Sequence, residues 1–309
     1  MRVLGLSAAD LSGWRDEGSP SKWAPMFRGL AVHADVLDVV TARTPRAGDL
    51  ADAVLRRAGR GRRRDAADLR AFAQRTADAE RRLRPWDGRC DVVLQLQTLC
   101  APGTRPRRYA ICTDGTRALF EREGGAGSRA AGPSRAQRLE AGVARDACVV
   151  MTFSAWVGRS FVEDYGVPPD RVVATGAGAN LLLRDVPDRR DRPPVALFAG
   201  YDFERKGGRV LLEAWREVAA ALPGARLVVA GPRRPVDRTA PGVRWAGRVG
   251  WAELARLYRE ATVFVLPSLF EPFGFVVLEA MGHGLPVIAS RACALPELVD
   301  DGVDGLLAP

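Results

Sequence analysis

Two glutamates and two cations in the second half of the chain have the types and spacing to do chemistry. Glu271 lies in the turn after an apolar run that ends at Pro267, and Glu279 lies eight residues further on. Carboxylates placed in this way can accept hydrogen bonds from the hydroxyl groups of one bound molecule. Arg205 and Lys206 precede a glycine pair and a predicted helix. Fixed positive charge beside a helix N-terminus favours an anion, so the set suits a sugar attached to a phosphate.

Predicted strands of a parallel sheet must position these residues. Thr262–Leu266 is a short β-branched and apolar run, and Val195–Ala199 is a similar run upstream. Each is followed by a loop and a predicted helix, at Phe273–Met281 and at Arg209–Leu222. Chemistry in such sheets is located where these loops emerge, at the carboxyl edge. We therefore expect both loops to face one ligand.

The rest of the chain also alternates strands with helices, which predicts an α/β fold with doubly wound parallel sheets. The other predicted strands are Arg2–Leu6, Val36–Val40, Val92–Leu96, Tyr109–Cys112, Cys148–Thr152, Val172–Thr175, Leu227–Ala230, Val243–Trp245 and Val287–Ala289. The other predicted helices are Asp49–Arg60, Asp65–Leu83, Ala155–Tyr165 and Trp251–Glu260. A chain of 309 residues with 47% apolar content can fill two cores. We expect domains at 1–178 and 195–309, joined by a polar, proline-rich linker at 179–194.

The sequence around the two glutamates resembles a known family. EPFGFVVLE, residues 271–279, is similar to the E-x7-E signature of the family-4 retaining glycosyltransferases, or glycosyl transferases group 1, which have the GT-B fold. Three more segments resemble the other blocks of that family's donor-binding domain: ALFAGYDFERKGG (196–208), VRWAGRVGWAELARLYREATVFVLPS (243–268) and GLPVIASRACALPELVDDGVDGLLAP (284–309). The resemblance implies two Rossmann-like domains facing a cleft. It also implies that the second domain is incomplete, since the family continues past the position of Pro309.

The resemblance implies a role for each candidate site residue. Lys206 and Arg205 would hold the diphosphate of a nucleotide sugar, Glu271 would contact hydroxyls of the donor sugar, and Glu279 would accept hydrogen bonds from the ribose. The donor-binding set would be completed by backbone groups at Phe273, Gly274 and Phe275 and by Gly200 at the end of the strand.

The chain departs from the family pattern at two places. The family's arginine usually follows the strand's glycine directly, where this chain has Tyr201. The family often carries a histidine near the fourth strand of the first domain, where this chain reads YAICTDGT. Asp114 or Thr116 could take over a polar role there.

The implied activity is that of a metal-independent, retaining glycosyltransferase of the hexosyltransferase type, acting in polysaccharide biosynthesis. It would move a sugar from a nucleotide-diphosphate sugar to a glycan, glycolipid or small-molecule acceptor, and it would need no cofactor besides that co-substrate. The main alternative is a non-catalytic GT-B-like module that binds a nucleotide or a partner. A phosphorylase or epimerase fits the glutamate spacing less well, and a glycosidase needs carboxylates on opposite faces of the scissile bond.

Composition narrows the remaining function classes. The formal charge is +9, but Lys22 and Lys206 are the only lysines, so the arginine excess indicates coding bias, and we expect a bacterial protein. Without a recognition helix or interleaved aromatic residues, the charge does not predict nucleic-acid binding. The histidines, His33 and His283, have no Cys or Asp at metal-ligand spacing. We expect His283 to be a packed or capping residue.

The cysteines and the N-terminus predict the cellular compartment. Five cysteines without C-x-x-C spacing indicate buried free thiols in a reducing compartment. MRVLGLS does not resemble a leader, and no apolar run is long enough to span a bilayer. We expect a cytoplasmic protein, with peripheral contact to the inner membrane face left open.

Some surface features have two interpretations. Trp14 and Trp23 either stack on an acceptor sugar or belong to the core. The arginine cluster at 56–64 is either a solvated helix face or a contact for anionic lipid head groups. The glycine segments at 124–128 and 176–180 do not satisfy a dinucleotide fingerprint.

Overall fold

The computed structural model describes residues 1–16, 21, 23–44, 62–122, 132–181, 186, 188–189, 192–237 and 239–309. The side chains of residues 62–67 are outside this description. The chain forms two compact units, Met1–Gly176 and Ala177–Pro309.

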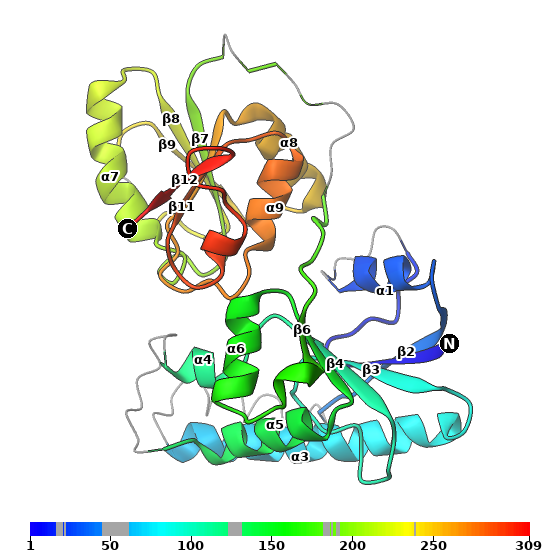
Figure 1. Cartoon of the computed structure of the whole chain (residues 1–309). Coiled ribbons are helices and arrows are strands. Elements are labelled where there is room, and N and C mark those ends of the chain that lie inside the picture. The colour runs from blue at the N-terminus through cyan, green and yellow to red at the C-terminus, as the bar shows by residue number, and fades with distance from the viewer. Residues whose placement is uncertain are drawn as a thin grey trace. The chain divides into compact units, whose positions relative to one another are not determined.

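The first unit is built on a parallel sheet of six described strands in the order β2-β1-β3-β4-β5-β6. The strands are β1 (Arg2–Ser7), β2 (Asp35–Thr41), β3 (Val92–Leu96), β4 (Tyr109–Thr113), β5 (Val149–Thr152) and β6 (Val172–Ala174). The helices are α1 (Ala24–Leu30), α3 (Arg62–Leu83), α4 (Arg117–Arg122), α5 (Arg135–Asp146) and α6 (Ala155–Glu163), with short 3₁₀ helices at Arg84–Trp86 and Pro169–Arg171. Figure 1 shows α1 on one face of this sheet and α3 and α5 on the other. Right-handed crossovers require this division when the chain turns back from β2 to β3.

Local sequence explains where two of these helices begin. Ser154 accepts a hydrogen bond from the backbone N–H of Val157 at the start of α6, and Ser134 accepts one from Gln137 at the start of α5. Each serine satisfies one of the N–H groups that a helix leaves without an internal partner.

The two tryptophans near the N-terminus belong to the core of the first unit. Trp14 is 3% exposed and packs against Phe27, and Trp23 is 4% exposed and packs against Phe153. The interpretation of these rings as a sugar-stacking surface is therefore wrong. Their indole groups contribute buried apolar area instead.

The second unit is built on another parallel sheet of six described strands, in the order β12-β11-β10-β7-β8-β9. The strands are β7 (Val195–Ala199), β8 (Arg226–Ala230), β9 (Val243–Gly247), β10 (Val263–Leu266), β11 (Val287–Ser290) and β12 (Gly305–Ala308). The helices are α7 (Gly208–Ala221), α8 (Trp251–Glu260) and α9 (Phe275–Gly282), with a short 3₁₀ helix at Leu295–Glu297. Figure 1 shows α7 on one side of the sheet and α8 and α9 on the other.

Strand order in the second unit creates a reversal between β7 and β10. The chain runs outward from β7 to β9, returns to β10 beside β7, and then runs outward to β12. The helices on either side of such a reversal lie on opposite faces, and open parallel sheets bind their ligands at this point, beyond the carboxyl ends of the two central strands. This is the place where the sequence puts Lys206 and Glu271.

The predicted α/β class and parallel sheets are confirmed, and most predicted strands differ from the observed ones by one or two residues. β12, α1, α4 and α5 were not predicted. The predicted helix at 49–60, the glycine segment at 124–128 and residues 56–61 of the arginine cluster lie outside the described residues, as do the side chains of Arg62, Arg63 and Arg64.

The cysteines are free, as predicted, but the expectation that all are buried is wrong. Cys100 and Cys112 are buried, Cys90 and Cys293 are intermediate, and Cys148 is exposed. Cys148 immediately precedes β5 rather than lying inside it, which explains its exposure. Across the described residues, no helix combines the length and the apolar character that crossing a membrane requires.

Candidate functional site

The loops after β7 and β10 are in direct contact at the carboxyl edge of the second sheet. The N–H of Leu269 donates to the carbonyl of Arg205 at 2.9 Å. Gly207 has a φ of 72°, and a Cβ on it would lie 1.7 Å from the carbonyl oxygen of Pro267. Only glycine permits this approach together with the left-handed backbone. The contact fixes the relative position of the two candidate loops.

Gly200, at the end of β7, allows the side chain of Lys206 to cross the strand end. A Cβ on Gly200 would lie 2.1 Å from the Cδ of Lys206. The aliphatic part of the Lys206 side chain therefore occupies the space that a side chain at position 200 would fill. The ammonium group of Lys206 then lies beside the loop after β10.

Lys206 and Glu271 form an ion pair at this edge. Nζ of Lys206 lies 2.7 Å from Oε2 of Glu271, and the two side chains are 12% and 10% exposed. The hydroxyl of Ser268 lies 3.5 Å from the same carboxylate oxygen. A pair this shielded from water interacts more strongly than one on an open surface. An ammonium group has three N–H donors, so Lys206 can keep this contact and still donate to a ligand.

Arg205 also reaches the loop after β10. Its Nη1 donates to the carbonyl of Phe270 at 2.5 Å and lies 3.8 Å from Oε2 of Glu271. Its Nε donates to Asp202 at 3.3 Å. The guanidinium therefore adds a second positive charge beside Glu271 while it braces the loop.

Aromatic side chains anchor the loop that carries Glu271. Phe270 is 1% exposed and Phe273 is 3% exposed. The rings of Phe273 and Phe275 meet edge to face with centroids 5.1 Å apart. Gly274 caps α9 in a left-handed conformation, and the helix starts at Phe275. The positive end of the helix dipole thus points into the loop cluster.

Glu279 lies inside the second unit, about one turn into α9. It is 3% exposed; its Oε2 accepts from the hydroxyl of Tyr258 at 3.1 Å, and its Oε1 accepts from Nδ2 of Asn180 at 3.4 Å. Burial raises the pKa of this carboxyl group above its usual value, while the Tyr258 and Asn180 hydrogen bonds and the charge of Lys206 act in the opposite direction.

His283 is a packed residue, as expected. It is 1% exposed, its Nδ1 lies 2.7 Å from the carbonyl of Glu279, and its ring stacks on Tyr258 with centroids 4.9 Å apart. Burial lowers its pKa, which favours the neutral ring.

Tyr201, where the family pattern has arginine, is 67% exposed. The guanidinium of Arg248, just after β9, lies 5.1 Å from the centre of the Tyr201 ring. Arg248 therefore supplies a cation beside Tyr201.

The first sheet has a cavity of about 220 Å³ at its carboxyl edge. It is lined by residues after β3 and β4 and by α4 and α5, including Gln97, Thr98, Asp114, Thr116 and Glu140. Thr116 is 1% exposed and its hydroxyl lies 2.7 Å from that of Ser160, so Thr116 is engaged within the fold. Asp114 is partly exposed in the lining.

Glu140, on α5, forms hydrogen bonds with several segments at this edge of the sheet. It is 7% exposed and accepts hydrogen bonds from the hydroxyls of Thr98 and Tyr165 and from the backbone N–H of Arg117, the last at 2.8 Å. Burial raises its pKa to about 7.

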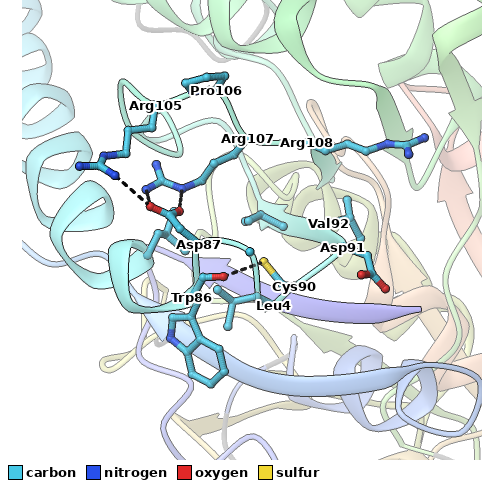
Figure 2. Close-up of a pocket in the computed structure, with 13 residues that line it drawn as sticks. Leu4, Trp86, Asp87, Cys90, Asp91, Val92, Arg105, Pro106, Arg107 and Arg108 are labelled. Atoms are coloured by element: carbon cyan, nitrogen blue, oxygen red, sulfur yellow. Dashed lines mark hydrogen bonds and ion pairs between the residues drawn. The ribbon is translucent and has the colours of Figure 1, made fainter.

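Another cavity, of about 510 Å³, lies at the amino edge of the first sheet, beside the segments that lead into β3 and β4 (Figure 2). Arg107 is bound there by Glu80 and Asp87, both at 2.9 Å, and Asp91 is bound by Arg2 at 2.9 Å. These charges neutralise one another, and the cavity lies opposite to the edge where parallel sheets bind ligands. We therefore look for candidate sites at the carboxyl edge of each sheet separately.

The sequence reasoning missed three residues at these edges: Tyr258, Asn180 and Glu140. Tyr258 lies on a helix whose pattern indicates only an apolar face, and Glu140 is one of many charged residues on a surface helix. A buried polar partner is visible only once helices are packed. Within the described residues, His, Cys, Asp and Glu side chains do not form a group of three or more that could hold a metal ion.

Comparisons with known proteins agree with this architecture. A family model described as glycosyl transferases group 1 matches residues 193–309. The chain is 37% identical over 126 residues to a D-inositol 3-phosphate glycosyltransferase of Segniliparus rotundus, covering 37% of this chain and 28% of that protein. It is 30% identical over 183 residues to an uncharacterized glycosyltransferase of Methanocaldococcus jannaschii, covering 52% of this chain and 47% of the other. The chain spans less than half the length of these curated relatives.

Solved structures share the fold of the whole chain. Sucrose-phosphate synthase from Thermosynechococcus elongatus has a TM-score of 0.66 at 17% identity, covering 100% of this chain and 86% of that one. WaaG, a glycosyltransferase involved in lipopolysaccharide biosynthesis, has a TM-score of 0.65 at 15% identity, covering 99% and 85%. At these identities the likeness concerns the fold. The chain has the GT-B fold, and residues 193–309 match the family model of the group 1 glycosyl transferases.

Proposed function

We propose that the protein is a retaining glycosyltransferase that moves a sugar from a nucleoside-diphosphate sugar to a carbohydrate or glycolipid acceptor. The observation that carries this proposal is the pair of Lys206 and Glu271, 2.7 Å apart at the strand-order reversal of the second sheet. A cation and a carboxylate in one shielded loop cluster suit a ligand that combines a diphosphate with hydroxyl groups.

Each candidate residue takes a role that its surroundings support. Lys206 and Arg205 bind the diphosphate, and the N-terminus of α9 at Gly274 and Phe275 adds backbone N–H groups. Glu271, in the loop between β10 and α9, accepts from hydroxyls of the donor sugar. Phe273 keeps that loop in place through its buried ring, and Gly200 leaves the space that Lys206 crosses.

Glu279 accepts hydrogen bonds from the ribose. Glu279 is the more deeply buried of the two glutamates, at 3% exposed against 8% for Glu271. In this proposal the ribose therefore lies beyond the diphosphate as seen from the sugar. The sugar, diphosphate and ribose then follow one another along the loop and the first turns of the helix.

The proposed chemistry is a front-face substitution without a protein nucleophile. The bond between the anomeric carbon and the diphosphate oxygen breaks, and negative charge grows on that oxygen. Lys206 and Arg205 stabilise this charge with fixed positive groups, so a metal ion is not required in the scheme. The departing diphosphate accepts the proton of the acceptor hydroxyl, which attacks from the same face and retains the configuration.

We place the acceptor on the first unit. Its carboxyl-edge cavity of about 220 Å³ is lined by hydroxyl, amide and carboxylate groups, which suit a hydroxylated molecule. The five free cysteines fit a reducing compartment, so we place the reaction in the cytoplasm, where peripheral contact with a membrane would present a glycolipid acceptor.

A donor panel tests the proposal. The melting temperature of the protein is measured with UDP-, GDP- and ADP-linked sugars, because a ligand that binds the native state raises it by mass action. The donor that stabilises the protein is then incubated with candidate acceptors, and the anomeric configuration of the product is determined. We expect one nucleotide class to stabilise the protein and to yield a product of retained configuration.

Two results would contradict the proposal. Stabilisation by none of the donors would remove the nucleotide-sugar site. Stabilisation without sugar transfer or donor hydrolysis would assign the protein to non-catalytic nucleotide-binding modules.

A further inference from the structure

The Glu279 carboxylate is held from two sides that differ in character. On the inner side its Oε2 accepts from Tyr258, which is 0% exposed, at 3.1 Å. On the other side its Oε1 lies 3.4 Å from Nδ2 of Asn180, a half-buried residue near the start of the second unit. A distance of 3.4 Å is at the long end for an N–H···O bond, so this second contact is the weaker one.

The Tyr258 ring leaves its hydroxyl little freedom. It packs against His283, with centroids 4.9 Å apart, and against Phe264, with centroids 5.8 Å apart. The hydroxyl lies 3.1 Å from Glu279 Oε2 and 3.3 Å from the carbonyl of Val276, and it has only one proton to donate. The carboxylate is nearer and charged, and a charged acceptor forms the stronger bond. The proton of Tyr258 is therefore directed at Glu279.

We propose that Tyr258 is a positioning residue that fixes Oε2 of Glu279 and thereby presents Oε1 to the ribose hydroxyls of the donor. The ribose displaces Asn180 from Oε1. This inference rests on the proposed nucleotide-sugar site and adds to it a residue on α8 that does not touch the ligand. It explains why a tyrosine, and not another large apolar residue, fills this place in the core.

The pH dependence of binding follows from the groups that face Glu279. These groups are Tyr258 from α8, Lys206 from the loop after β7, Asn180, and His283 directly after α9. The charges of Arg189 and Arg259 act in turn on His283. Burial raises the pKa of Glu279, and the Tyr258 hydrogen bond opposes that rise. Ribose affinity needs the charged acceptor, so it falls as pH drops through this pKa. Without the tyrosine hydroxyl the pKa rises further, and the loss of affinity begins at a higher pH.

Calorimetric titration tests the inference. UDP, GDP and ADP are each titrated into the wild-type protein. The tightest binder is then titrated into Tyr258→Phe, Glu279→Gln and the double variant, at pH values from 5.5 to 8 in steps of about 0.5. This range spans the second ionisation of the phosphate group, near pH 6. Tyr109→Phe is the matched control, because it removes another buried tyrosine hydroxyl, one that donates to the carbonyl of Val143 in the first unit. Phosphate ionisation affects every variant alike, so differences between variants report on the carboxyl group.

We expect Tyr258→Phe to bind roughly tenfold more weakly at pH 7 and to lose affinity at a higher pH than the wild type. Glu279→Gln should abolish the difference that Tyr258→Phe makes, and Tyr109→Phe should match the wild type. If Tyr258→Phe binds as the wild type does, with the same pH profile, while Glu279→Gln binds weakly, then the positioning role is refuted and the nucleotide site remains. If UDP, GDP and ADP all fail to bind the wild type, the nucleotide site and this inference fall together.

Asn180→Ala supplies a test that does not depend on the folding of Tyr258→Phe. Because Asn180 occupies the oxygen that the ribose needs, its removal should leave affinity the same or higher. A loss as large as that of Glu279→Gln would show that Asn180, not Tyr258, holds the carboxylate, and would overturn the inference.

Discussion

The two units carry parallel sheets of the same size but use carboxylates differently at their carboxyl edges. In the second unit, Glu271 is paired with Lys206 in a loop cluster beside a helix N-terminus. In the first unit, Glu140 is bound by two hydroxyls and a backbone N–H and has no cation at ion-pair distance among the described residues. The charged pair can respond to a ligand, whereas the hydroxyl-bound carboxyl group connects α5 to the loops that follow β3 and β4.

The difference shows that burial alone does not identify a ligand-binding carboxylate. Glu140, Glu271 and Glu279 are all buried. What separates them is the partner: hydroxyls and an amide for Glu140, a lysine for Glu271, and a tyrosine with a weak amide contact for Glu279. A carboxylate whose partners can be exchanged is available to a substrate.

Lys206→Ala should have the largest effect on activity among the variants of the second unit. Without the ammonium group, charge on the departing diphosphate is less stabilised, so we expect turnover to fall by about 100-fold to 1000-fold. The control is Arg209→Ala, which removes an exposed cation three residues away, paired with Glu204 on the surface. Steady-state kinetics with the matched donor would contradict the account if both variants retained wild-type turnover.

Gly207→Ala should disrupt the contact between the loops that follow β7 and β10. Its Cβ would collide with the carbonyl of Pro267 and its φ is 72°, so we expect a loss of about 2–4 kcal/mol in the free energy of unfolding, with reduced activity. Gly224→Ala is the control: its φ is 98° but a Cβ there meets nothing within 4 Å, so only the backbone strain of about 1–2 kcal/mol remains. Equal losses in urea denaturation would show that the loop contact is unimportant.

Glu140→Gln should change how stability depends on pH in the first unit. Burial raises the pKa of Glu140 to about 7 in the folded protein, from an unfolded value near 4.5. The folded state therefore binds the proton more tightly, and this contribution to wild-type stability is present at low pH and is lost as pH rises from about 4.5 to about 7. It amounts to at most about 3 kcal/mol. Urea denaturation from pH 5 to pH 8 should show the wild type losing stability relative to Glu140→Gln; parallel curves would refute this.

Glu80→Gln should have the smallest effect, because it lies at the amino edge, away from both carboxyl edges. The hydrogen bond from Arg107 lowers the pKa of Glu80 to about 2, so its contribution to stability is present above about 4.5 and is lost as pH falls toward 2. Its side chain is 24% exposed, and such pairs contribute up to about 1 kcal/mol. We expect a loss of that order at pH 7 with unchanged turnover. A large fall in turnover would mean that the amino-edge cavity takes part in the reaction.

The sequence predicted the elements whose signals are local. β7 and β10 are continuous apolar runs closed by glycine or proline, and α6 begins at a serine cap, so their positions followed from residue type and period. β12 is short and directly follows a polar turn, where neither period nor propensity identifies a strand. Its pairing with β11 depends on the sheet.

The sequence predicted the loop residues of the candidate site but not the buried residue that contacts Glu279 from another helix. Lys206 and Glu271 each follow a predicted strand, so parallel-sheet geometry alone brings them to one edge. Tyr258 is 21 residues from Glu279 along the chain and meets it only because α8 and α9 pack on the same face of the sheet. Contacts of this kind depend on helix packing, which a single sequence does not show.

A crystal structure with the tightest-binding nucleoside diphosphate would test the central claim most directly. The account predicts phosphate oxygens about 3 Å from Nζ of Lys206, and a ribose hydroxyl on Oε1 of Glu279 in place of Asn180. A diphosphate bound elsewhere, with Lys206 still held by Glu271 alone, would contradict it.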